Sequence, residues 1–278
     1  MRDTDSEANS ARDLRPHVKQ LKSTSADLRH LFGDRVTARY IAEPFIAFDS
    51  IRAADDIRIF MEDRDYDIVG VRKLGAVVGF ADRMDLTSGT LGDHKKRFDD
   101  RHRVDEAMSI VMVLTRLADS PRVCVEVWGQ VSGIITRGDL QKAPVRMWFF
   151  ALLSLLEMQF LRLIRSRLTD DDWIAQLDSG ASARIKRVFK TRQDRNEEID
   201  LADCTFFKDK VDAIAKIEPL RLSLGFESEH ALSVEFAEII ALRNDLAHGH
   251  DIVKSGTASL ARIAARTEQL LQLCEDMS

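Results

Sequence analysis

The feature that most constrains the fold of this chain is an internal repeat. Residues 79–86 read GFADRMDL, and residues 133–140 read GIITRGDL, with equal spacing from Gly79 to Gly133 and from Asp85 to Asp139. Each copy follows an apolar, β-branched run and precedes sequence that favours helix. A repeat of this kind indicates two copies of one small folding unit.

Both copies predict the same order of elements, a helix followed by a β-hairpin. The expected elements of the first copy are a short strand, a helix and two hairpin strands, at 44–48, 50–63, 66–71 and 76–80. Those of the second copy are a helix and two hairpin strands, at 104–117, 122–127 and 131–136.

The repeated element is a glycine, two apolar residues, a serine or threonine, two free positions and an aspartate. It resembles the most recurrent element of cystathionine-β-synthase (CBS) domains, in a tandem pair of βαββα units from about residue 30 to 143. The second copy matches fully through Gly133, Thr136 and Asp139. The first copy departs from the pattern, because Asp82 replaces the hydroxyl residue while Asp85 is kept.

The resemblance implies that AMP, ADP or ATP binds as a regulatory ligand in the cleft between the copies. Thr136 would contact phosphate, and Asp139 would hold the ribose hydroxyls, with Asp85 as the corresponding residue of the other copy. Because a carboxylate at Asp82 repels phosphate, one occupied site is expected rather than two. Alternatively, Asp85 and Asp139 only cap short helices, and the pair is a dimerisation module without ligand.

The chain from residue 145 onward contains no strand pattern and predicts an all-α bundle. Its expected helices are at 145–168, 171–177, 181–195, 201–217, 228–247 and 257–276, separated by residues such as Gly180, Pro219 and Gly225. The sequence therefore predicts an α+β multidomain protein. Its parts are a disordered tail and lead-in helix at 1–29, a repeat pair at 30–143, and a helical bundle at 144–278.

One motif stands at the end of the predicted helix 228–247. Arg243 is followed directly by Asn244, and His248 comes after four intervening residues. This resembles the signature of HEPN domains (higher eukaryotes and prokaryotes nucleotide-binding), over about residues 145–276. His250 departs from the pattern, since a tyrosine is common there.

The HEPN resemblance implies a metal-independent endoribonuclease in which the ribose 2′-hydroxyl attacks the adjacent phosphate. His248 would be the general acid or base, since histidine titrates near neutrality. Arg243 would hold the phosphate, and Asn244 would orient either partner. In that family two such sets meet across a two-fold axis, so a homodimer is expected.

Other interpretations of the motif stay open. On an ideal helix Arg243 lies about 140° from His248, so the two converge only if the last turn loosens. Both residues would otherwise only offset the negative end of the helix dipole. The alternative function is a non-catalytic nucleotide sensor and dimerisation or regulatory protein. A third interpretation has the helical half bind nucleotide without cleaving it.

The apolar run 147–164 contains Glu157, Gln159 and Arg162, which are costly in lipid. We therefore expect a buried helix and a dimer interface, with no membrane contact. Glu157 needs a partner, and Arg243, Arg162 and Arg165 are the candidates.

Basic residues concentrate in 181–195, which is either a phosphate track for RNA or a solvated face. The basic run 94–97 is interpreted as a connecting loop. The whole chain has 41 Lys and Arg residues and 46 Asp and Glu residues, which gives a net charge of −5. Any RNA contact must therefore be local.

The three cysteines are far apart in the sequence and lack Cys-x-x-Cys spacing. We therefore expect neither a disulfide framework nor a zinc site. The polar N-terminus has no apolar core of a secretory signal. We expect a cytoplasmic protein without metal, acting in stress or phage defence, with RNA and an antitoxin or other protein as partners. The short connection 140–144 suggests that nucleotide binding influences how the helical halves pair.

Overall fold

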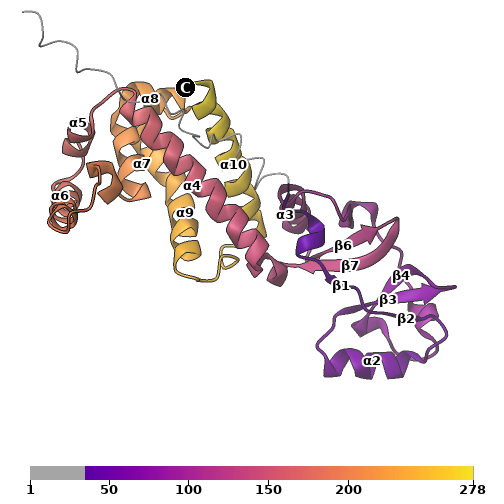
Figure 1. Cartoon of the computed structure of the whole chain (residues 1–278). Coiled ribbons are helices and arrows are strands. Elements are labelled where there is room, and N and C mark those ends of the chain that lie inside the picture. Colours follow the sequence, from indigo (N-terminus) through magenta and orange to yellow (C-terminus); the bar gives the residue numbers. More distant parts are fainter. Residues whose placement is uncertain (1–34, 278) are drawn as a thin grey trace, which may run out of the picture.

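A computed structural model describes residues 35–277, so the predicted tail and lead-in helix at 1–29 lie outside the described residues. The protein has a β-containing part and a helical part, joined by the long helix α4 (Ala143–Arg165), as Figure 1 shows. This mixed α and β architecture agrees with the fold class expected from the sequence.

The first unit begins with the 3₁₀ turn η1 (Ala38–Tyr40) and the short strand β1 (Glu43–Pro44). Its further elements are β2 (Ala47–Asp49), α2 (Ala54–Asp63), β3 (Ile68–Lys73), β4 (Ala76–Asp82), η2 (Arg83–Asp85) and η3 (Leu91–His94). Strands β2, β3 and β4 form a three-stranded sheet in which β2 runs parallel to β3.

The second unit repeats this plan. Its elements are η4 (Asp100–His102), β5 (Arg103–Asp105), α3 (Ile110–Asp119), β6 (Arg122–Val127), β7 (Gln130–Thr136) and η5 (Arg137–Gln141). They form a sheet of order β1-β7-β6-β5, again with a parallel pair, β5 and β6, and an antiparallel hairpin, β6 and β7.

The two hairpins share the same register, including a shift at the same place. Val71 pairs with Gly79 just before the shift in the first hairpin, and Val125 pairs with Gly133 in the second. A Cβ atom on Gly79 would collide with the backbone of Lys96, and one on Gly133 would lie 3.1 Å from the Cβ of Ala42. The repeated glycine is therefore needed where a neighbouring segment crosses the strand.

Two predicted elements differ from the structure. The expected strand at 44–48 is two strands, because β1 leaves its own unit and pairs with β7 while β2 stays with β3. The helix expected at 104–117 begins only at Ile110, because Val104 lies in strand β5 and pairs with Val125 of β6. The strand exchange of β1 interlocks the two units, and no local sequence pattern encodes it.

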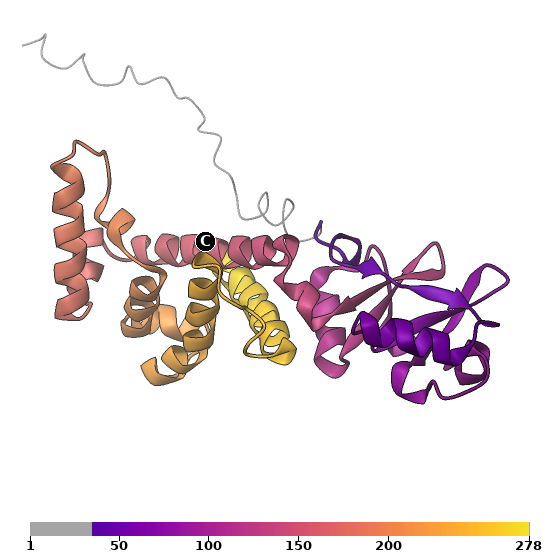
Figure 2. The same ribbon diagram turned by 90° about the horizontal axis from the view of Figure 1, so that it is seen from below.

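The helical part consists of α4 and six further α-helices among the described residues. They are α5 (Asp170–Ala175), α6 (Ser179–Gln193), α7 (Phe207–Lys216), α8 (Glu218–Ser223), α9 (Glu229–Ala247) and α10 (Thr257–Asp276), with the 3₁₀ turn η6 (Leu201–Cys204) before α7. Helix α4 runs along one side of the bundle and is covered by α7, α9 and α10 (Figure 2).

The single helix expected at 201–217 was wrong. The chain is extended at Phe206, whose backbone N–H donates to the carboxylate of Asp209 and starts a new helix, α7. Helix α8 was not expected, because Pro219 was interpreted as a separator. Proline is tolerated in the first turn of a helix, and there it begins α8 instead.

One hydrophobic core runs from the second unit into the bundle. It joins Val125 and Ile135 of the sheet to Trp148 of α4 and Leu270 of α10. The first unit has a separate core around Ile57, Met61 and Val71. The second unit and the helical bundle therefore pack as one body. They are joined by a shared hydrophobic core as well as by the short connection 140–144.

Helix α4 is long and apolar enough to cross a membrane, the one such helix among residues 35–277, but 56% of its apolar stretch is buried within the protein. The core helix of a globular protein has the same composition. The cysteines Cys124, Cys204 and Cys274 are all buried as free thiols. Burial raises the pKa of the Cys124 thiol to about 11, so this thiol is unreactive at neutral pH.

Candidate functional site

A cleft of about 700 Å³ lies between the two repeated units. Small-molecule sites typically have volumes of about 300 to 1,000 Å³. Apolar side chains of both units form part of its wall, namely Pro44, Phe45, Ile46, Tyr66 and Ile134. Polar and charged residues line it as well, including Glu43, Asp67, Arg122, Thr136, Arg137 and Asp139. Thr136 and Asp139 therefore share one cleft.

Thr136 and Asp139 form a capping box at the start of η5. The Oδ2 atom of Asp139 accepts hydrogen bonds from the Thr136 backbone N–H at 2.7 Å and from its hydroxyl at 2.9 Å. We expected Asp139 to cap a helix that follows it. Instead, Thr136 is the capping residue and Asp139 closes the box from the third position of the turn.

The Asp139 carboxylate is also held by Lys142, whose Nζ lies 2.9 Å from Oδ1 and 2.6 Å from the Ile41 carbonyl oxygen. Lys142 pairs with Glu43 of β1 too, so it ties the two units together at the cleft. A carboxylate has about four lone-pair positions, of which three are then used. One position on Oδ1 is left without a partner among the described residues.

Phosphate recognition at this end of the cleft needs a free donor. The Thr136 hydroxyl proton is directed to Asp139, and Arg122 donates to Asp82 at 3.1 Å. Arg137 pairs with no carboxylate among the described residues. The guanidinium of Arg137, which the sequence did not single out, is therefore the cation lining this cleft that no carboxylate of the described residues neutralises.

Asp85 does not join Thr136 and Asp139. It lines neither the large cleft nor a smaller one of about 220 Å³, whose wall includes the aromatic ring of Phe98 and the side chain of Arg122. The Nζ of Lys96 pairs with both Asp82 and Asp85. Hydrogen bonds to these two carboxylates raise the pKa of Lys96.

The first copy of the motif is therefore filled by ionic contacts of the protein itself. The run 94–97, interpreted as a connecting loop, contributes Lys96 to them through a bridge between Phe80 and Lys96. The available signal was the pair of carboxylates at 82 and 85, which need a nearby cation once they lie in a partly covered position.

Helix α9 begins and ends where the sequence predicted, because Ser228 caps its start and Gly249 follows its end. The Ser228 hydroxyl accepts from the Ala231 backbone N–H at 3.1 Å. Gly249 has a φ of 72°, and the His250 backbone N–H donates to the Asp245 carbonyl at 2.8 Å. This is the hydrogen-bond pattern of a Schellman motif.

The three motif residues lie on the last turns of α9. Arg243 is half-buried, whereas Asn244 and His248 are exposed. No hydrogen bond joins Arg243 to His248 within residues 35–277. The ring of His248 lies 5.8 Å from that of His250, between centroids. The helix thus presents an arginine and an imidazole near one end without a hydrogen bond between them in a single chain.

Glu157 of α4 lies 3.9 Å from Arg243, between Oε2 and Nη2, at the limit of an ion pair. Its nearer partner is Lys210 of α7, whose Nζ lies 2.9 Å from Oε1 and also donates to the Thr205 hydroxyl. Lys210 is only 4% exposed. Arg165, another candidate partner of Glu157, pairs with Asp170 and Asp200 instead.

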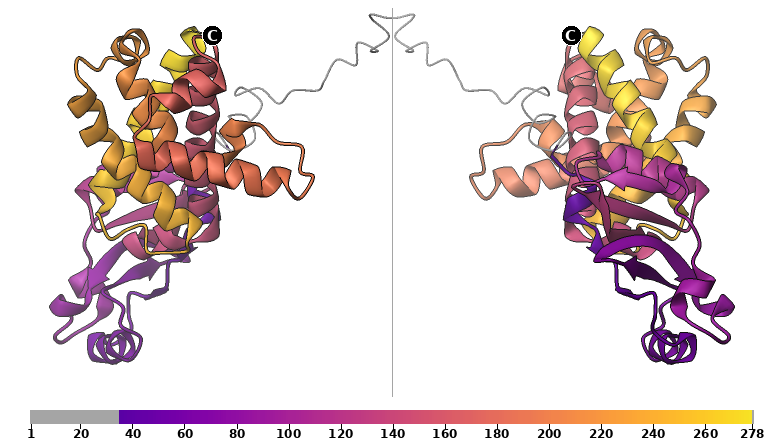
Figure 3. Two further views of the ribbon diagram at one scale, coloured as in Figure 1. Left: turned by 90° about the vertical axis from the view of Figure 1, so that its left-hand side faces the viewer. Right: turned by 90° about the vertical axis from the view of Figure 1, so that its right-hand side faces the viewer.

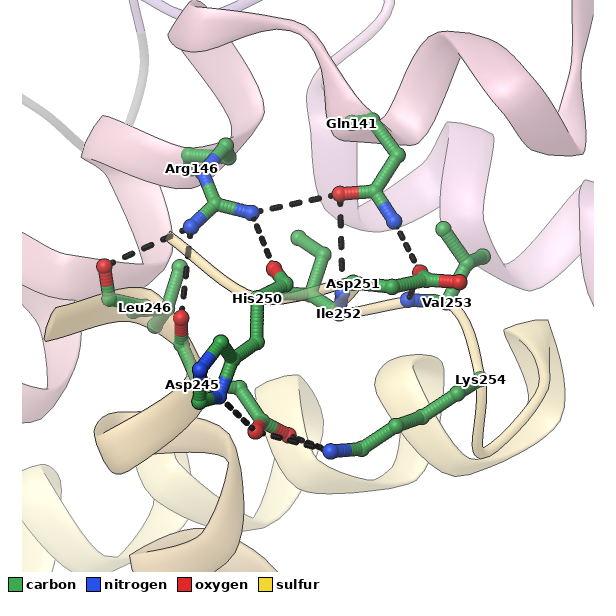
Figure 4. A network of polar contacts seen from close by, with 9 residues as sticks. All are labelled: Gln141, Arg146, Asp245, Leu246, His250, Asp251, Ile252, Val253 and Lys254. Carbon is green, nitrogen blue, oxygen red and sulfur yellow. Dashed lines mark hydrogen bonds and ion pairs between the residues drawn. The ribbon is translucent and has the colours of Figure 1, made fainter. Parts of the chain in front are cut away.

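Arg146 of α4 holds the end of α9, as Figure 4 shows. Its guanidinium donates to the His250 carbonyl at 2.7 Å and to the carbonyls of Asp245 and Leu246 at 3.3 Å. The Asp245 carboxylate accepts from Lys254 at 2.7 Å, and this bond is the main reason why the pKa of Asp245 is lowered.

Helix α6 lies at the end of the bundle farthest from the sheets and stands out from it (Figure 3). Arg184 and Arg192 pair with Asp209 and Glu197. Lys186, Arg187 and Lys190 are exposed and have no ion-pair partner among the described residues. These three cations of α6 are thus available to contact a polyanion.

The described residues contain no group of three or more His, Cys, Asp or Glu side chains placed to hold a metal ion.

No protein-family model matches this chain, and no curated protein matches it. The solved structures that resemble part of it include CBS-domain proteins. The CBS domain of a bacterial CNNM/CorC family Mg²⁺ transporter is 19% identical, with 42% of this chain and 81% of that chain covered and a TM-score of 0.34. CBSX2 from Arabidopsis thaliana is 16% identical, with 40% and 96% covered and a TM-score of 0.35. CBSX2 has also been solved in complex with AMP. A CBS domain-containing protein from Bacillus anthracis is 13% identical, with 40% and 94% covered and a TM-score of 0.36.

Proposed function

We propose that this protein is an adenine-nucleotide-regulated, metal-independent endoribonuclease that acts as a dimer. The observation that carries the regulatory half is the cleft between the repeated units, with Thr136 and Asp139 at one end and apolar walls elsewhere. A nucleotide has matching parts, namely a flat base, a diol and a phosphate.

The cleft fits a nucleotide part by part. Pro44, Ile46 and Tyr66 offer apolar surface to the base. The remaining lone-pair position of Asp139 Oδ1 accepts one ribose hydroxyl. Arg137 meets the phosphate, since an arginine presents five N–H donors to an anion.

Catalysis is assigned to the end of α9. His248 is exposed and transfers the proton of the ribose 2′-hydroxyl, while Arg243 stabilises the charge that develops on phosphate oxygens. Asn244, also exposed, orients either group. Because no hydrogen bond joins Arg243 to His248 within the described part of one chain, a second copy completes the set.

An exposed apolar face on α4 supports pairing of two chains. Met147, Phe150 and Met158 are 60%, 49% and 55% exposed, and their spacing places them within one face of the helix. Two α4 helices packed along this face would bury it. An antitoxin or another protein seated there is the competing occupant.

RNA binding is assigned to the exposed, unpaired cations of α6. Lys186, Arg187 and Lys190 contact phosphates without base specificity, so RNA affinity should fall as salt rises. The whole-chain charge of −5 makes this local surface necessary.

The test is incubation of purified protein with RNA, with and without AMP, beside two variants. His248→Ala should lose cleavage. His230→Ala, an exposed histidine at the other end of α9, should keep it. Equal cleavage by wild type and His248→Ala would remove the nuclease assignment. Nucleotide binding without cleavage would leave the alternative, a non-catalytic sensor and dimerisation protein in the cytoplasm.

A further inference from the structure

Arg137 reaches two parts of the protein at once. It lines the cleft beside Thr136 and Asp139. Its Nη2 atom also donates a hydrogen bond to the carbonyl oxygen of Val253, far along the chain. Val253 lies in the segment 249–256, which joins α9 to α10 and directly follows His248.

The same turn and the start of α4 hold this segment at further points. Gln141 donates to the Asp251 carboxylate and accepts from the Ile252 backbone N–H at 3.4 Å, as Figure 4 shows together with the Arg146 contacts. Ile252 and Val253 are 1% and 4% exposed. The segment is therefore packed against the second unit.

We infer that Arg137 binds a phosphate group in the cleft and that this binding orders the segment 249–256. This inference rests on the proposed nucleotide site. One of the five donors of Arg137 is used by Val253, and no other hydrogen bond or ion pair engages the guanidinium within residues 35–277. The remaining donors can bind phosphate while the Val253 contact is kept.

A guanidinium fixed at one end by phosphate loses rotamer freedom, so its bond to Val253 is made a larger fraction of the time. Phosphate binding therefore orders the segment 249–256 and with it the end of α9. The coupling is reciprocal, so an ordered segment also strengthens phosphate binding. The sign of the regulation follows: a phosphorylated ligand stabilises the arrangement that carries His248.

Calorimetry with AMP and with adenosine separates this role from a structural one. Arg137→Ala should weaken AMP binding by about tenfold to a hundredfold, the range for a hydrogen bond to a charged group, and leave adenosine binding unchanged. Arg137→Lys should bind AMP with intermediate affinity. Arg58→Ala, which removes an arginine from α2 outside the cleft, is the control and should match wild type.

Hydrogen–deuterium exchange of the full chain tests the transmission. The amides of His250, Ile252, Val253 and Gly256 are hydrogen-bonded. AMP should slow their exchange in wild type but not in Arg137→Ala, and adenosine should not slow it. Without ligand, Arg137→Ala should already exchange faster there.

The outcomes separate the two levels of the proposal. If wild type binds neither AMP nor adenosine, the proposed nucleotide site fails and the inference fails with it. If AMP binds, but Arg137→Ala binds it equally well or AMP leaves the segment's exchange unchanged, the inference alone is overturned.

Discussion

The Nζ atom of Lys96 lies 2.7 Å from Oδ2 of Asp82 and also pairs with Asp85. In the second copy the corresponding positions are Thr136 and Asp139, which pair with each other and face an open cleft. The aspartate at position 82, in place of a threonine, thus gives the first copy an ion-pair cluster where the second copy lines the large cleft. The duplicated unit is symmetric in its backbone and asymmetric in its chemistry.

We predict that one AMP binds per chain. The second cleft is smaller, and Asp82 and Asp85 of the first copy would repel phosphate if Lys96 were removed. Lys96→Met should therefore keep both the stoichiometry and the affinity of AMP, measured by calorimetry. Two AMP molecules per chain in wild type would contradict this explanation.

Thr136→Ala should remove one capping contact and one wall of the cleft. We expect a loss of about 1 kcal/mol in the free energy of unfolding, the usual contribution of such a cap, and weaker AMP binding. The matched control is Thr90→Ala, because Thr90 forms the same box with Asp93 at η3, outside the cleft. Urea unfolding should show similar losses for both variants, whereas calorimetry should show weaker AMP binding for Thr136→Ala only.

The sequence predicted the hairpins of the two units and placed Thr136 and Asp139 correctly at the end of β7, because the repeated glycine and aspartate occupy equivalent backbone positions. It did not predict the exchange of β1, since a two-residue strand has no periodicity of its own. Nor did it indicate Lys142, which meets Asp139 and Glu43 only after the units interlock.

Glu157 and Lys210 form a largely buried pair between α4 and α7. Glu157→Gln should leave the Lys210 cation without a close carboxylate and lower the free energy of unfolding by about 3 kcal/mol. The double variant Glu157→Gln with Lys210→Met should be more stable than Glu157→Gln alone, because the uncompensated charge is gone. Urea unfolding of wild type, Glu157→Gln, Lys210→Met and the double variant measures the coupling. Strict additivity of the two losses would show that the pair does not interact.

The end of α9 illustrates the same division between local and tertiary information. Ser228 and Gly249 predicted both ends of the helix from sequence, since capping is a local effect. Arg146 and Lys210 were not identified, although they hold Asp245 and Glu157 of the candidate region. Their partners lie about 100 and 50 residues away in the chain, and such pairings depend on how the helices pack.

Stability should depend on pH through Asp245. Its pKa is lowered from 3.8, mainly by the hydrogen bond from Lys254. A carboxylate with a lowered folded-state pKa stabilises the protein fully above its unfolded value and loses this effect as the pH falls through the folded value. The difference in unfolding free energy between wild type and Asp245→Asn should therefore be constant near neutral pH and shrink below about pH 3.8. Urea unfolding across this range checks it, and a difference that grows on acidification would show that the assigned sign is wrong.

The exposed face of α4 gives the last prediction, which concerns assembly. Phe150 is 49% exposed in the middle of that face, and burying an aromatic side chain between two chains contributes about 2 kcal/mol. Phe150→Asp should place a charge in the contact and shift the protein toward monomer in sedimentation velocity. Leu74→Asp, at a hairpin turn and 99% exposed, adds the same charge away from α4 and should leave the assembly unchanged.

Because no hydrogen bond joins Arg243 to His248 within the described part of one chain, the monomeric variant should also lose RNA cleavage while still binding AMP. A Phe150→Asp protein that stays dimeric would place the interface on another face, and one that is monomeric yet cleaves RNA would show that a single chain completes the site.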